Sequence, residues 1–378
     1  MKISFLCFDL SDNSLGRAAL LAGALARHHA VTLVGPKKQA TVWYPLRHLD
    51  LPYKIFPWKR YPAFIPVIRQ MMKAMDGDVL FACKLRPTSF GIGLLKKWVS
   101  GKPLIVDIDD WELGFFYRAD FWGRVGRFLN FSNPNGLPHT WLMERLVKFA
   151  DGITVSNKFL QNRFSGTLLY HCRDTSFLNP DKFDRDRAKE KLGVQDKKVV
   201  MFLGTPRKHK GVDDLVKAVN KIDDPNITLV IIGVEGGRKS FLGRDKMAKD
   251  RLVVLPMISF TDLPEHLAAA DVVVIPQRRT SDTVGQMPAK IFDAMAMAKP
   301  IVSTRVSDIP EVLGDTGYLV DPDNVNQLAD AITHVFSHPD EARLKGEQAR
   351  ARCIALYDIK VMEKQLLELV KSVRQTTE

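Results

Sequence analysis

The chain has 378 residues, of which 46% are hydrophobic and 26% are charged. This length is too great for one ordinary core and suits two domains, and the composition is that of a globular protein. No stretch reaches the roughly 18 uninterrupted apolar residues of a membrane span, and we expect no signal peptide, because residues 3–8 already form a strand-like apolar run. The four cysteines lack CxxC spacing, which argues against a zinc site or a disulfide framework and favours the cytoplasm.

The net charge of +12 is concentrated in the first part of the chain. Residues 1–150 hold 21 Lys and Arg against 11 Asp and Glu, a net charge of +10, whereas residues 151–378 hold 34 against 32. A basic N-terminal half predicts an anionic partner, such as lipid head groups, a phosphorylated acceptor or nucleic acid. Scattered lysines that only keep the protein in solution are the alternative.

Strand-like apolar runs alternate with helical stretches in the first half of the chain. We expect strands at residues 3–8, 31–34, 53–56, 79–82, 104–108 and 153–155, and helices at 17–28, 66–75 and 140–149. These strands are continuous apolar runs rather than alternating ones, as in parallel sheets that are covered on both faces. The alternation of strands and helices predicts a doubly wound parallel sheet.

The second half of the chain repeats this scheme. We expect strands at 199–203, 227–232, 252–255, 272–275, 301–303 and 318–320, with helices starting near 212, 263, 289 and 324. The polar segment 178–187 marks a boundary between an N-terminal domain, residues 1–178, and a C-terminal domain, residues 179–357. A last helix, predicted by apolar spacing over 358–373, is assigned with residues 358–378 to the N-terminal domain. The predicted fold class is α/β, with two Rossmann-like domains facing across a ligand-binding cleft.

A loop rich in glycine and basic residues, GTPRKHKG at 204–211, follows the strand 199–203 and opens a helix. Glycine lets the backbone approach a diphosphate, and a helix N-terminus favours negative charge. We therefore expect Lys210 and Arg207 to neutralise a nucleoside diphosphate beside Gly204. A solvated basic turn is the alternative.

A second segment, MPAKIFDAMAMAKPIV at 287–302, follows the strand 272–275 and contains a helix. Asp293 stands early in this helix, where an ionised carboxylate can accept two hydrogen bonds side by side. The alternative is an acid that only favours the helix dipole, an effect worth roughly 0.3–1 kcal/mol.

Together the two segments resemble the donor-nucleotide half of a retaining glycosyltransferase of family 4, whose fold is GT-B. The family's first loop reads G-R-x-x-x-x-K-G. Lys210 matches its lysine, whereas Thr205 stands at the arginine position and Arg207 is displaced along the loop. The resemblance covers nearly the whole chain and is strong over residues 199–322.

The family's second motif reads P-x-K-l-f-E-x-M-A-x-G-x-P-V-V. Pro288 and Lys290 match it, and Asp293 stands where the family has Glu. The resemblance implies that Asp293 accepts both ribose hydroxyls of the donor nucleotide. A further Glu of the family, which touches the donor sugar, falls at Gly285, and Asp282 is its candidate replacement. The other substrate-binding residues expected in this domain are Thr205, Gln286, Met287 and Gly233.

A strand-to-helix turn near the N-terminus contains Ser14, Gly16 and Arg17. Similar enzymes use this loop to approach the donor phosphate and the acceptor, so we expect these three residues to bind substrate. The turn itself holds one glycine and is not a G-x-G-x-x-G fingerprint, which argues against a nicotinamide cofactor.

Four acids stand at the end of the strand 104–108, in the sequence IVDIDDWE: Asp107, Asp109, Asp110 and Glu112. Many members of the resembling family carry a His at the position of Asp109, close to the reacting sugar. We therefore expect Asp109 to contact the acceptor or the sugar. A metal site is disfavoured, because GT-B enzymes generally neutralise the leaving group with cations from the protein. A cluster that caps the next helix is the remaining alternative.

Two segments of the N-terminal half, 53–73 and 115–131, combine aromatic residues with Lys and Arg. Such segments suit a peripheral contact with an anionic membrane. The aromatics packing in the core is the main alternative. Nucleic acid is disfavoured, since no nucleic-acid fold pattern accompanies them.

The resulting prediction is a retaining, metal-independent hexosyltransferase without a cofactor, which moves a sugar from a UDP- or GDP-linked donor to a glycan or lipid-linked acceptor in cell-surface polysaccharide or glycoconjugate synthesis. Lys210, Arg207 and Asp109 are the candidate catalytic residues, acting by charge stabilisation and positioning. The alternative is a non-catalytic protein that only binds sugar nucleotides, because Gly285 and Asp109 replace the family's Glu and His.

Overall fold

The computed structural model describes residues 1–117, 120–235 and 251–375, and the chain folds into two compact units. The first unit consists of Met1–His171, Val284–Met287 and Lys360–Glu378, and the second of Cys172–Thr283 and Pro288–Ile359. The division after His171 precedes the boundary that we predict at residue 178. Within these described residues, no helix combines the length and the apolar character needed to cross a membrane.

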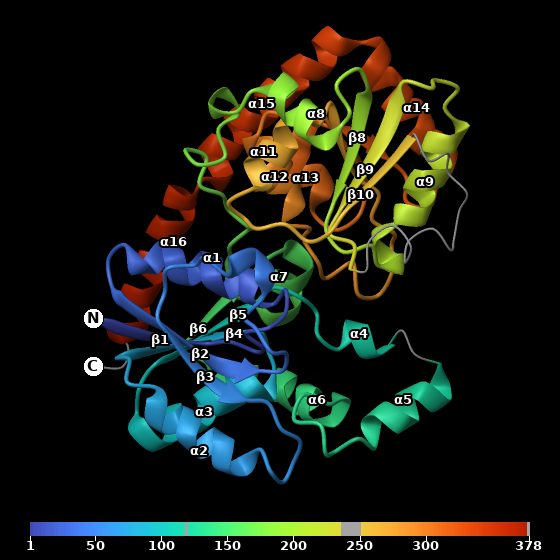
Figure 1. The fold of residues 1–378 in the computed structure, drawn as a ribbon. Helices are drawn as coiled ribbons and strands as arrows, with labels where there is room; N and C mark the ends of the chain where they lie inside the picture. The colour runs from blue at the N-terminus through green and yellow to red at the C-terminus, as the bar shows by residue number, and fades with distance from the viewer. Residues whose placement is uncertain (118–119, 236–250, 376–378) are drawn as a thin grey trace. The chain divides into compact units, whose positions relative to one another are not determined.

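The first unit is built on a seven-stranded parallel sheet in the order β3-β2-β1-β4-β5-β6-β7 (Figure 1). Its strands are β1 (Lys2–Leu6), β2 (Ala30–Lys37), β3 (Tyr53–Pro57), β4 (Val79–Cys83), β5 (Leu104–Ile108), β6 (Gly152–Val155) and β7 (Thr167–Leu168). Phe5 of β1 pairs with Phe81 of β4, and their rings stack with centroids 4.6 Å apart. Cys83 pairs with Asp107 of β5, so the acidic segment begins at the carboxyl end of β5.

Helices cover both faces of this sheet. The helices of the first unit are α1 (Leu15–Ala26), α2 (Ile65–Ala74), α3 (Ile92–Ser100), α4 (Gly114–Tyr117), α5 (Phe121–Phe128), α6 (Leu137–Leu146), α7 (Lys158–Phe164) and α16 (Ile359–Gln375). Leu6 and Val34 pack with Val67 and Met71 of α2 in an apolar cluster that also includes residues of α3 and α6. α1 lies on the face opposite α2 and α3 (Figure 1). This two-sided cover explains why the central strands are largely apolar.

The second unit contains a six-stranded parallel sheet in the order β10-β9-β8-β11-β12-β13. Its strands are β8 (Lys198–Leu203), β9 (Ile227–Ile232), β10 (Leu252–Leu255), β11 (Val272–Ile275), β12 (Ile301–Thr304) and β13 (Tyr318–Val320). Its helices are α8 (Arg185–Leu192), α9 (Val212–Lys221), α11 (Leu263–Ala268), α12 (Lys290–Ala296), α13 (Ile309–Leu313), α14 (Val325–Ser337) and α15 (Pro339–Tyr357). Val200 and Phe202 of β8 pack with Leu215 of α9 and Leu328 of α14 in the core.

The two sheets confirm the predicted α/β class with two Rossmann-like domains. The strands predicted at 104–108, 227–232, 252–255, 272–275 and 318–320 coincide with β5, β9, β10, β11 and β13, and the other predicted strands differ by one to three residues at an end. The short strand β7 has no counterpart among the predicted elements, because two residues carry no periodicity.

Helix α15 also has no counterpart among the predicted elements. Its buried residues include Ala342, Gly346, Ala349 and Cys353, so the apolar pattern of a helix is weak in its sequence. A Cβ added at Gly346 would lie 2.3 Å from the carbonyl oxygen of Ala298. Close backbone contact therefore helps to position this helix against the chain that follows α12.

Candidate functional site

The loop 204–211 connects β8 to α9 in the second unit, and glycine is required at both of its ends. Gly204 has a φ of 106° and Gly211 a φ of 66°, which are left-handed conformations that glycine adopts at no steric cost. A Cβ at Gly211 would lie 1.8 Å from the carbonyl oxygen of Pro276, so the backbone after β11 directly contacts this loop. Gly233, with a φ of 107°, ends β9, and a Cβ there would lie 2.8 Å from the carbonyl carbon of Gly204. The ends of three strands therefore meet backbone to backbone at this point.

Two lysine ammonium groups converge on Gly204. A Cβ built on Gly204 would lie 3.2 Å from Nζ of Lys290 and 3.7 Å from Nζ of Lys210. Lys290 begins α12, and its Nζ lies 4.1 Å from the ring centroid of Phe202. Burial, and then the charge of Lys210, hold the pKa of Lys290 well below its usual range. An anion bound at Gly204 would favour the charged form of Lys290.

The other predicted residues of this loop are Arg207 and Thr205. Arg207 is exposed, and its carbonyl oxygen accepts the backbone N–H of Lys210 at 2.8 Å. Thr205 is half-buried directly after Gly204. Contact of Arg207 or Thr205 with a diphosphate stays a prediction.

Asp293 is buried in the first turn of α12 and forms an ion pair with Arg173. Nε of Arg173 donates to one carboxylate oxygen, and Nη2 donates to the other at 3.3 Å. Sequence reasoning did not find Arg173. It follows the two-residue strand β7, and no pattern in the surrounding sequence points to it.

The carboxylate of Asp282 lies inside the second unit and is fully buried. The hydroxyl of Thr280 donates to it at 2.6 Å, and Nδ1 of His209 lies 3.5 Å from its second oxygen. Its carboxylate therefore helps to connect the loop 204–211 to the segment after β11. Contact of Asp282 with a donor sugar stays a prediction.

The segment Val284–Met287 belongs to the first unit. The side-chain amide of Gln286 donates to Asp110 at 2.9 Å, and Met287 is buried. A Cβ at Gly285 would lie 2.6 Å from Cβ of Trp111. An acidic side chain therefore does not fit at Gly285 in this arrangement. Pro288 follows as the first residue assigned to the second unit again.

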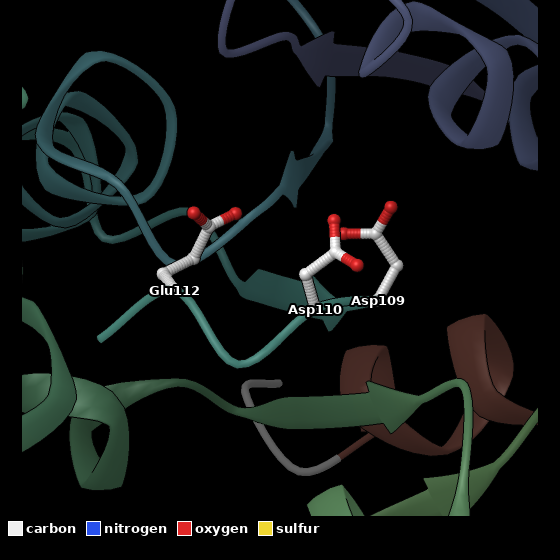
Figure 2. Close-up of side chains that lie close together, drawn as sticks. All are labelled: Asp109, Asp110 and Glu112. Carbon is white, nitrogen blue, oxygen red and sulfur yellow. The ribbon is translucent and has the colours of Figure 1, made fainter. Parts of the chain in front are cut away.

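The acidic segment of the first unit surrounds a buried lysine. Figure 2 shows the carboxylates of Asp109 and Asp110 next to one another after β5, with Glu112 on the loop that follows. Nζ of Lys84 lies 2.9 Å from Asp109, 2.5 Å from Asp110 and 3.1 Å from Glu112. Lys84 has a φ of 73°, which is uncommon for a residue with a side chain. Nε of Arg86 adds a hydrogen bond to Glu112 at 2.7 Å.

The cation of this cluster is therefore supplied by the protein. Asp109, Asp110 and Glu112 have carboxylate oxygens within 4.8 Å of one another, which is a spacing that could hold a metal ion. The ammonium group of Lys84 is already within hydrogen-bond distance of all three. Such a donor set suits an internal ion cluster better than a site for a divalent metal.

The two aspartates of this cluster differ in acidity. Burial raises the pKa of Asp109 to about 7, against the opposing charge of Lys84 and with further contributions from neighbouring carboxylates. Burial also opposes ionisation of Asp110, but the charge and hydrogen bond of Lys84 outweigh it and lower the pKa of Asp110. Asp109 is thus the carboxyl group of this cluster whose pKa is raised toward neutral pH, and its contact with the acceptor or the sugar stays a prediction.

Hydrogen bonds of Arg17 connect the start of α1, after β1, to the sheet of the first unit. Nε and Nη2 of Arg17 donate to the two oxygens of Asp107 at 3.1 and 2.9 Å, and Nη2 also donates to the carbonyl of Leu169 at 2.7 Å. The hydroxyl of Ser14 donates to the carbonyl of Asp9 at 3.2 Å. A Cβ at Gly16 would lie 3.3 Å from the Trp43 ring. The structure thus shows structural contacts for this turn, and its contact with substrate stays a prediction.

Part of the chain matches a known protein family. Residues 197–338 match the sequence model of the family described as "Glycosyl transferases group 1". The chain is 24% identical, over 93% of both chains, to a GDP-mannose-dependent alpha-(1-6)-phosphatidylinositol monomannoside mannosyltransferase of Mycolicibacterium smegmatis. It is 32% identical to D-inositol 3-phosphate glycosyltransferase of Mycobacterium bovis over 40% of this chain and 32% of that protein.

The fold has solved counterparts along its whole length. The HepE protein of Anabaena, solved in complex with UDP-glucose, has a TM-score of 0.75 and 17% identity, with 98% of this chain and 100% of that chain covered. Fold and matches together define a GT-B glycosyltransferase that depends on a nucleotide-activated sugar. Residues 197–338 are thus the part of the chain that matches the glycosyl transferases group 1 family.

Proposed function

We propose that this protein transfers a hexose, with retention of configuration, from a UDP- or GDP-linked donor to a glycan or lipid-linked acceptor. The observation that carries the proposal is the convergence of Lys210 and Lys290 on Gly204 at the carboxyl end of β8. Backbone amides and ammonium groups at such a point favour a diphosphate. The name of the mycobacterial relative, which specifies GDP-mannose and a phosphatidylinositol acceptor, supports a lipid-linked acceptor.

In the proposed reaction the donor diphosphate lies against Gly204, and Lys210 and Lys290 stabilise the charge that develops as the bond between the sugar and the diphosphate breaks. The acceptor hydroxyl forms the new bond on the face that the diphosphate leaves, and the departing diphosphate oxygen takes its proton. Asp109 positions a hydroxyl of the sugar or the acceptor, since a carboxyl group with a pKa near 7 can either donate or accept a hydrogen bond.

Scanning calorimetry with UDP, GDP, ADP and CMP tests the donor class. A ligand at 100 times its dissociation constant adds about 2.7 kcal/mol to the stability of the state that binds it. We expect UDP or GDP to raise the unfolding temperature and the corresponding sugar nucleotide to be turned over or slowly hydrolysed. Absence of stabilisation by all four nucleotides would contradict the proposal.

A non-catalytic sugar-nucleotide-binding protein is the second candidate. The crowding that a side chain would meet at Gly285 favours it, because the family's sugar-contacting Glu is absent there. Stabilisation by a nucleotide without turnover of any sugar nucleotide would support this candidate, and measurable turnover would exclude it.

We also propose that helix α5 contacts an anionic membrane. Phe121, Trp122 and Phe128 are 64%, 76% and 49% exposed, and no residue of the helix is buried. At 100° per residue these three side chains share one side of the helix, and the exposed Arg124 and Arg127 flank it. Aromatic side chains beside arginines suit the interface of an anionic bilayer. α5 lies away from the sheet of its unit (Figure 1).

The first aromatic and basic segment, 53–73, is less exposed than the second. Phe64 is buried in the apolar core of the first unit, and Val67 and Met71 of α2 pack beside it. The core interpretation therefore accounts for part of this segment, and the membrane proposal rests on α5.

Sedimentation with phosphatidylglycerol vesicles at low salt tests the membrane proposal. We expect the double variant Phe121→Ser/Trp122→Ser to bind vesicles about tenfold more weakly or worse, since each large apolar side chain contributes about 1.5–3 kcal/mol when buried. Phe177→Ser, at an exposed aromatic residue of the second unit, is the matched control and should bind like the wild type. Equal sedimentation of the double variant, or none by the wild type, would refute the role of α5.

A further inference from the structure

Arg173 has partners at each of its guanidinium nitrogens within the second unit. Its side chain is 9% exposed. Nε and Nη2 donate to the two oxygens of Asp293, Nη1 donates to the carbonyl of Cys172 at 2.8 Å, and Nη2 donates to the carbonyl of Ala289 at 3.2 Å. Its guanidinium carbon lies 6.0 Å from the ring centroid of Phe260. These contacts fix both the carboxylate of Asp293 and the residue that precedes α12.

Arg173 and Asp293 form a charged pair in a buried place. Burial opposes the charge of Arg173, but the charge of Asp293 and its hydrogen bond outweigh burial, so the pKa of Arg173 is raised. Removing one partner of such a pair leaves the other charge buried without compensation. Arg173 therefore holds the plane of the Asp293 carboxylate.

The pair lies close to the two converging lysines. Lys290 and Asp293 are three residues apart on α12, which places them on one side of the helix. The charge of Asp293 acts on Lys290 and partly opposes the lowering of its pKa. Each carboxylate oxygen has two lone pairs, and Arg173 uses one on each oxygen, so both oxygens can still accept another hydrogen bond.

We propose that Arg173 is a positioning residue for the ribose of the donor, which acts by holding the carboxylate of Asp293 toward the two ribose hydroxyls. This inference rests on the proposed nucleotide-sugar donor. Asp is one methylene shorter than the Glu that the family carries here, and a two-point contact from Arg173 compensates by fixing where the shorter carboxylate lies. Specificity for a ribonucleotide then depends on a residue that does not itself touch the ribose.

Calorimetric titration with UDP or GDP and with the matching 2′,3′-dideoxy nucleoside diphosphate tests this inference. We expect the wild type to prefer the ribonucleotide at least about tenfold, as for a hydrogen bond to a charged group. Arg173→Ala should reduce that preference to about twofold or less and leave binding of the dideoxy compound unchanged. Arg173→Lys keeps the charge without the two-point contact. Its preference for the ribonucleotide should lie between those of the wild type and of Arg173→Ala.

The double variant Arg173→Ala/Asp293→Ala separates positioning from a general loss of structure. It should show the same preference as Asp293→Ala alone, because Arg173 acts only through Asp293. Arg173→Lys also covers the case in which Arg173→Ala does not fold. Retention of the full ribonucleotide preference by a folded Arg173 variant would overturn this inference alone. A wild type that binds neither compound would overturn the proposed function and this inference together.

Discussion

Lys210→Ala is expected to slow sugar transfer about 100- to 1,000-fold, which is the usual effect of removing one preorganised donor from a developing negative charge. Lys210 is one of two ammonium groups that converge on Gly204, and the other is that of Lys290. The loss should appear in kcat and in the affinity for the nucleoside diphosphate, because the charge is present in the product and grows in the transition state. Activity within twofold of the wild type would refute the assignment.

Lys208→Ala provides the matched control for this variant. Lys208 is an exposed lysine of the same loop, two positions away, and the same charge is lost from the protein. Lys208→Ala should leave the rate of sugar transfer nearly unchanged, so that a loss shared by both variants would indicate a general electrostatic effect.

The second unit holds none of the six tryptophans, so its stability with nucleotide is best followed by scanning calorimetry.

Lys290 is expected to respond to the loss of Lys210. The charge of Lys210 contributes to the low pKa of Lys290, so its removal lets Lys290 carry a positive charge more fully. The single variant therefore retains part of the charge stabilisation. The effects of Lys210→Ala and Lys290→Ala should not add, as is usual for neighbouring groups that act as one unit.

The sequence predicts the strands well because burial on both faces makes them continuous apolar runs. It also predicts a phosphate-binding loop with Gly204 and Lys210, because glycine and basic residues stand together in one short segment. Lys290 was identified only by its match to the resembling family's second motif, and the structure brings its side chain to Gly204 beside Lys210.

Other features depend on contacts between distant residues and leave no local pattern. Arg173 reaches Asp293 across 120 residues of chain, and its own surroundings show no motif. Lys84 lies 25 residues before Asp109, so the acidic segment looks in the sequence like a possible metal site, although the structure supplies a lysine to it. In the sequence, Asp282 is a candidate for contact with a sugar. The structure buries its carboxylate, and its partners there depend on how the loops fold.

Lys84→Met is expected to lower the free energy of unfolding of the first unit by about 3–5 kcal/mol at pH 7, because it leaves buried carboxylates without their cation. Lys84 lies within 3.1 Å of three carboxylates, and its side chain is 10% exposed. Urea unfolding followed by tryptophan fluorescence reports on this unit, since all six tryptophans lie in it. Lys54→Met is the control. Its pair with Asp76 is exposed, and such pairs contribute at most about 1 kcal/mol.

The stability lost in Lys84→Met should depend on pH in a defined direction. The three carboxylates raise the pKa of Lys84 well above its usual value despite burial, so its contribution is fully present below about pH 10.5. The lowered pKa of Asp110 gives stability above about pH 3.8 that is lost in acid.

The pKa of Asp109 is shifted in the opposite direction, so its effect on stability has the opposite dependence on pH. Its raised pKa, about 7, makes the folded state bind more protons than the unfolded state, so ionising it costs stability as the pH rises toward 7. Without Lys84 the two aspartates lose the positive charge that favours their ionised forms, so the deficit of the variant should shrink as the pH falls from 8 toward 4. A deficit below 1 kcal/mol, or one that stays constant over this range, would show that Lys84 does not compensate the cluster.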